Sequence, residues 1–94
     1  MAPESIQRKQ YSPKSDVYAY GVTCTEILTR DEPYPGAAPV NVAVAVIRDG
    51  LRPAIPDWCP QMLQELIWRC LDAMPDPRPS MKQVQAELSQ MMAL

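Results

Sequence analysis

The chain lacks several residue types on which common active sites depend. Its 94 residues include no histidine and no phenylalanine. The absence of histidine excludes Ser-His and Cys-His nucleophile pairs and histidine metal sites. The three cysteines, Cys24, Cys59 and Cys70, are odd in number and form no C-x-x-C pair. We therefore expect reduced thiols rather than a disulfide framework or a zinc site, as in an intracellular, cytoplasmic protein.

Charge of one sign and long apolar runs are also missing. The chain carries 9 basic and 11 acidic residues, which are spread along its length and give a net charge of −2. We therefore expect no nucleic acid partner. No apolar stretch reaches the length of a membrane span, so we expect no such span. Hydrophobic residues make up 47% and charged residues 21%, which is typical of one globular domain.

Eleven prolines and the spacing of the apolar residues predict an all-α fold. We expect four main helices, joined by proline-rich connections, at residues 15–30, 39–49, 60–72 and 80–92. Residues 1–14 are expected to hold a turn or a short helical piece followed by a loop. The segment 15–30 is apolar on several faces, which indicates a helix in the core. Ser80 and Gln83 match a capping box at the start of the last helix.

The segment 39–49 fits two structures. Its valines alternate with Asn41, Ala43 and Ala45, which is a strand pattern. However, Pro39 suits the first position of a helix, and Gly50 suits the residue just past a helix end. We favour the helix.

Five short motifs occur in a fixed order along the chain. Met1 to Glu4 contains A-P-E, and residues 15–22 read S-D-V-Y-A-Y-G-V. Further matches are Pro33-Tyr34 with Gly36, then Gly50, Arg52-Pro53 and Pro56, and finally Cys70, Pro75, Arg78 and Pro79. Together they resemble the C-terminal part of a protein kinase domain, from the A-P-E motif to the last helix of the C-lobe. The G-x-R-P-x-x-P stretch is similar to that of tyrosine kinases and of tyrosine-kinase-like serine/threonine kinases, so both specificities stay open. Leu71 departs from the tryptophan that the family often has there, and Trp68 lies three positions earlier.

The resemblance implies a single partial kinase domain over residues 1–94, without the N-lobe, the catalytic loop and the magnesium-binding motif. ATP, Mg²⁺, protein substrates and a part in signal transduction belong to the parent family. For this chain alone we expect no cofactor, no catalytic residue and no activity. Because Met1 is itself a motif residue, we interpret the chain as a fragment or a truncated gene model.

The resemblance also implies roles for three residues. In the family, the A-P-E glutamate pairs with the arginine of the last motif, which are Glu4 and Arg78 here. The planar guanidinium suits this role because it binds a carboxylate at two points. The aspartate that opens the central helix, Asp16 here, holds the catalytic loop in the family. From the residues alone, Glu4 and Arg78 are two unrelated surface charges, and Asp16 is a carboxylate at a helix start.

Two further interpretations remain open. The chain could instead be a non-catalytic interaction module or a pseudokinase-derived scaffold, in which Pro53 and Pro56 form a P-x-x-P ligand. The same residues also suit a stiff connection between helices. Finally, the apolar helix at 15–30 predicts self-association, since an exposed apolar surface favours contact between copies.

Overall fold

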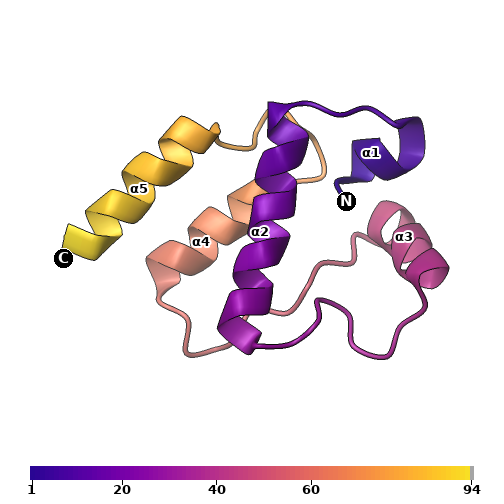
Figure 1. Cartoon of the computed structure of the whole chain (residues 1–94), viewed down its shortest axis with the longest axis horizontal. Coiled ribbons are helices and arrows are strands. Elements are labelled where there is room, and N and C mark those ends of the chain that lie inside the picture. Colours follow the sequence, from indigo (N-terminus) through magenta and orange to yellow (C-terminus); the bar gives the residue numbers. More distant parts are fainter. Residues whose placement is uncertain (94) are drawn as a thin grey trace.

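The computed structural model describes residues 1–93, and all regular structure in that range is helical. The helices are α1 (Pro3–Arg8), α2 (Pro13–Thr29), α3 (Pro39–Arg48), α4 (Gln61–Cys70) and α5 (Met81–Ala93). Figure 1 shows α2 in the middle, with α4 and α5 on one side and α1 and α3 on the other. The expected all-α fold is confirmed. The short α1 precedes the four expected helices.

The central helix α2 begins two residues before its expected start. Ser12 is its N-cap, and its side-chain oxygen accepts a hydrogen bond from the backbone N–H of Ser15 at 3.3 Å. Pro13 follows as the first helical residue, where its missing N–H costs nothing. The helix ends at Thr29 because Arg30 adopts a left-handed conformation with φ 57°.

The valine-rich segment forms α3 and not a strand, so the helix interpretation is confirmed. Pro39 occupies its first turn, and Gly50 has a φ of 70° just past its end. That left-handed conformation suits glycine and stops the helix. Val46 is buried, whereas Val40 and Val44 are exposed, so alternate valines of this helix face opposite environments.

Two clusters of buried side chains form the core, and α2 contributes to both. Tyr18 of α2 packs with Ala2 before α1 and with Ile67 and Leu71 of the α4 region. On the other side, Val17 packs with Leu66, Cys70 and Val84. The crossing of α2 and α4 is close, since a Cβ added at Gly21 would lie 3.0 Å from Cys70 Cβ and Leu71 Cδ2.

The last helix α5 starts with the expected capping box. The backbone N–H of Ser80 donates to Gln83 Oε1 at 2.8 Å, and the backbone N–H of Gln83 donates to Ser80 Oγ at 3.1 Å. The helices α4 and α5 are each within one or two residues of their expected bounds. Within the described residues, no helix combines the length and the apolar composition needed to cross a membrane.

Candidate functional site

A two-point ion pair joins the two ends of the chain. Arg78 Nη1 lies 2.7 Å from Glu4 Oε2, and Arg78 Nη2 lies 2.8 Å from Glu4 Oε1. The two residues are 74 positions apart. The side chain of Arg78 is 0% exposed and that of Glu4 is 11% exposed. The pair therefore lies in the interior, where it is shielded from salt and water.

The guanidinium of Arg78 uses all five of its N–H donors. Besides the two bonds to Glu4, Nε donates to the backbone oxygen of Asp72 at 2.9 Å. Nη1 also donates to the backbone oxygen of Lys14 at 3.0 Å, and Nη2 to that of Ala73 at 3.5 Å. Full hydrogen bonding is what a buried charge requires. Arg78 thus connects α1, the start of α2 and the loop between α4 and α5.

The first turn of α2 supports both members of the pair. Ser15 Oγ donates a hydrogen bond to Glu4 Oε2 at 2.8 Å. Lys14 Nζ donates to the backbone oxygen of Arg78 and, at 3.4 Å, to that of Asp76. The ammonium and the hydroxyl therefore fix the two segments that carry Glu4 and Arg78. These roles of Lys14 and Ser15 were not predicted from the sequence.

The ring of Tyr18 receives two guanidinium groups. The Cζ atom of Arg78 lies 5.0 Å from the ring centroid, and that of Arg52 lies 5.3 Å from it. Both distances suit cation–π attraction, which strengthens where water is excluded. Burial raises the pKa of the Tyr18 phenol, against the opposing effect of the two arginines. Tyr18 therefore stays a neutral phenol near neutral pH.

Arg52 connects the other half of the molecule to the same centre. Its Nε donates to the backbone oxygen of Leu71 at 2.8 Å, just after α4. Its Nη1 donates to the backbone oxygens of Leu51 at 2.8 Å and of Val46, in α3, at 3.4 Å. Arg52 thus links α3 to the end of α4. The R-P motif marked Arg52 in the sequence but did not predict these hydrogen bonds.

The hydrogen bonds from Arg78 lower the pKa of the Glu4 carboxyl from 4.5 to about 2, and those from Ser15 and the backbone act in the same direction. Burial alone would raise that pKa, so the arginine dominates. Glu4 is consequently ionised throughout the neutral range. A carboxylate with so low a pKa is a weak general base near pH 7, because its affinity for a proton is small.

Asp16 lies apart from this centre. It belongs to the first turn of α2, and its side chain is exposed. Ser12, and not Asp16, performs the N-cap role at this helix. Negative charge here still favours the helix, because the N-terminal end of the helix dipole is positive. Among residues 1–93, no group of three or more His, Cys, Asp or Glu side chains is placed to hold a metal ion.

Comparison with known proteins points to one family. The family described as protein tyrosine and serine/threonine kinase matches residues 1–88. A dual specificity protein kinase of Dictyostelium discoideum is 42% identical over 91 residues, which cover 96% of this chain and 17% of the relative. A probable serine/threonine-protein kinase of the same organism is 39% identical over 83 residues, covering 88% and 6% respectively.

A serine/threonine/tyrosine-protein kinase of Arabidopsis thaliana is 40% identical over 88 residues, which cover 94% of this chain and 23% of the relative. The chain thus spans less than a quarter of the length of each of these relatives. The matched span establishes that the chain belongs to the protein tyrosine and serine/threonine kinase family, as a part of its kinase domain.

Proposed function

We propose that this chain forms the helical base of an ATP-dependent protein kinase domain and that it transfers no phosphoryl group by itself. The observation that supports this proposal most directly is the complete hydrogen bonding of the Glu4–Arg78 ion pair. Every donor of the guanidinium is engaged, and the carboxylate stays ionised near neutral pH because Arg78 lowers its pKa to about 2. Such groups stabilise a fold but have no free donor or proton to offer a substrate.

The sequence supports the same conclusion. Phosphoryl transfer by a protein kinase needs a glycine-rich loop over the phosphates, an aspartate base and an aspartate that binds magnesium. This chain has three glycines, Gly21, Gly36 and Gly50, and no G-x-G-x-x-G motif. Without histidine and phenylalanine it has neither the H-R-D nor the D-F-G motif. We therefore assign no residue of this chain to ATP or magnesium.

For the parent domain, we propose transfer of the γ-phosphate of ATP to a hydroxyl group of a protein, with Mg²⁺, as part of intracellular signalling. The relatives support this activity, since they are named as serine/threonine, tyrosine or dual specificity kinases. In that domain, the exposed carboxylate of Asp16 would accept hydrogen bonds from the catalytic-loop backbone. Its position at the start of α2, on the surface, leaves it accessible to such a partner.

The alternative of an interaction module receives less support from the packing of its P-x-x-P segment. Pro53 is fully buried, and Ile55 packs against the core cluster around Tyr18. A proline-rich ligand must present its prolines to an aromatic groove on its partner. The burial of Pro53 instead favours a stiff connection between α3 and α4.

A phosphorylation assay tests the proposal for this chain. The purified chain is incubated with radiolabelled ATP, Mg²⁺ and general protein substrates, beside a mock purification from the same host. We expect no incorporation of phosphate above the mock control. Incorporation that co-purifies with the chain and disappears on heating would show that the chain is an enzyme.

The transcript upstream of the Met1 codon tests the proposal for the parent domain. We expect the open reading frame to continue and to encode an H-R-D aspartate and a D-F-G aspartate. An in-frame stop codon directly upstream of Met1 would instead favour the interaction module or the pseudokinase-derived scaffold.

A further inference from the structure

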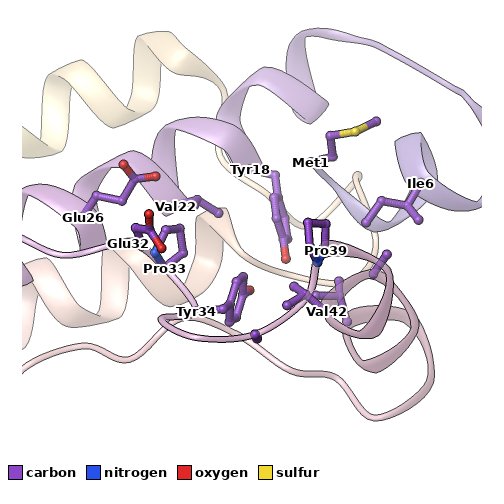
Figure 2. Close-up of a pocket in the computed structure, with 13 residues that line it drawn as sticks. Met1, Ile6, Tyr18, Val22, Glu26, Glu32, Pro33, Tyr34, Pro39 and Val42 are labelled. Carbon is purple, nitrogen blue, oxygen red and sulfur yellow. The ribbon is translucent and has the colours of Figure 1, made fainter.

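A cavity lies between α1, α2, α3 and the loop that joins α2 to α3. Its volume is about 500 Å³, which is within the range of small-molecule sites in proteins. Most of its wall is apolar, with Val22 from α2 and Val42, Ala43 and Val46 from α3. Figure 2 shows Val22 and Val42 of these walls, together with Met1 and Ile6 at one end of the cavity.

A buried hydroxyl without a partner points into this cavity. Tyr18 is 1% exposed, and its Oη is the one buried side-chain oxygen or nitrogen in residues 1–93 that has no hydrogen-bond partner. In Figure 2 the Tyr18 hydroxyl is directed toward Tyr34, Pro39 and Val42, which also line the cavity. Buried hydroxyls in proteins are nearly always paired, so this one is a donor that is available to an acceptor atom.

The end of the cavity opposite Met1 is acidic. Glu26 and Glu32 line it there, and both side chains are exposed. Within the described part of the chain, neither carboxylate takes part in an ion pair. No lysine or arginine lines the cavity. The two carboxylates therefore favour a cation at this opening, whereas the guanidinium groups of Arg52 and Arg78 lie near the ring of Tyr18.

We propose that this cavity binds a small amphipathic amine. The apolar body of the amine lies against Val22, Val42 and Val46. An acceptor atom of the ligand accepts a hydrogen bond from the Tyr18 hydroxyl. The ammonium group of the ligand faces Glu26 and Glu32. The phenols of Tyr18 and Tyr34 keep their O–H groups near neutral pH and can therefore donate hydrogen bonds. The reason is that burial raises the pKa of Tyr34 to about 12 and also raises that of Tyr18. This binding site is independent of phosphoryl transfer, so the failure of one proposal leaves the other standing.

A matched pair of probes tests the proposal on the full chain. Diethylaminoethyl benzoate has an aromatic body, an ester oxygen and an ammonium group, and in its uncharged carbon isostere a CH replaces the nitrogen. Binding is followed by amide chemical shifts in two-dimensional NMR spectra. We expect the amine to bind about 2- to 30-fold more tightly than the isostere, and added salt to reduce the difference. The shifts should lie in α2, α3 and the loop between them.

Two variants separate the two polar contacts. Tyr18→Phe removes only the hydroxyl and should weaken binding of both probes about 2- to 10-fold. The double variant Glu26→Gln with Glu32→Gln should remove the preference for the amine and leave binding of the isostere unchanged. Because the two glutamates are exposed, this variant tests the charge without disturbing the core.

Matched controls lie outside the cavity. Tyr11→Phe removes an exposed phenol and Glu65→Gln an exposed carboxylate, and neither should change binding. Equal affinity for the amine and the isostere, or unchanged binding in Tyr18→Phe, would overturn the proposal. So would amide shifts confined to a second groove, which Met62, Met91 and Met92 of α4 and α5 help to line.

Discussion

Replacement of Arg78 by alanine tests the claim that the Glu4–Arg78 pair holds the fold together. The change leaves the Glu4 carboxylate with Ser15 as its remaining side-chain partner. It also deprives the backbone oxygens of Lys14, Asp72 and Ala73 of the guanidinium. Breaking a buried ion pair by removing one member costs about 3–5 kcal/mol, because the remaining charge is left uncompensated.

This loss is large beside the stability of a chain of this length. At about 0.05–0.15 kcal/mol per residue, 94 residues give an unfolding free energy of roughly 5–14 kcal/mol. In domains of this size, each kcal/mol lowers Tm by about 4–8 °C. We therefore expect Arg78→Ala to lower Tm by at least about 12 °C. Thermal unfolding followed by far-UV circular dichroism measures the shift.

The surface pair Arg69–Glu87 provides the matched control. It too is a two-point contact between arginine and glutamate, but its side chains are 47% and 32% exposed. Exposed pairs contribute about 0–1 kcal/mol, so Arg69→Ala should lower Tm by only a few degrees. If Arg78→Ala and Arg69→Ala melt at the same temperature, burial does not give the Glu4–Arg78 pair its strength, and the reasoning fails.

Three further outcomes are expected. Because the folded-state pKa of Glu4 is about 2 against 4.5 for the free group, its contribution to stability is present above about pH 4.5 and is lost as the pH falls toward 2. Glu4→Gln should remove this part of the acid dependence in urea unfolding curves. Gly21→Ala should destabilise the chain by about 1–3 kcal/mol, measured in the same way, because the new Cβ meets α4 at 3.0 Å. Ile27, which is 70% exposed on α2, is our candidate for self-association, so Ile27→Asp should shift the mass of the chain in light scattering toward the monomer.

Each of these outcomes has a contrasting result. An unchanged acid limb in Glu4→Gln would show that other carboxyl groups cause the acid unfolding. Thr23→Ala, an exposed position on α2, is the control for Gly21→Ala and should change stability little. A wild-type chain that stays monomeric at high concentration would rule out self-association through α2.

Local chemistry made most of the helices predictable. Pro39 and Gly50 mark the two ends of α3, and Ser80 with Gln83 marks the start of α5. These signals act over a few residues, so they survive in the sequence whatever the tertiary contacts are. The start of α2 was placed late because Ser15 and Asp16 look like caps, whereas Ser12 forms the cap and frees Ser15 to bind Glu4.

The site was less predictable because its contacts are long-range. The family motifs supplied the candidates Glu4 and Arg78, but the periodicity of the sequence carries no signal for a pair so far apart. The contacts of Lys14 and Arg52 involve backbone oxygens, which every residue has. No residue type at the accepting position could therefore have revealed them.

The separation of Glu4 and Arg78 has a consequence for the order of folding events. Closing a loop of 74 residues costs roughly 4 kcal/mol of chain entropy by the logarithmic relation, and the desolvation of two buried charges offsets much of their attraction. We therefore expect the ion pair to form only after α2 and α4 have shortened the loop. During synthesis, the ion pair can fix α1 only after Arg78 has left the ribosome. We therefore expect proteases to degrade a chain that ends before Arg78.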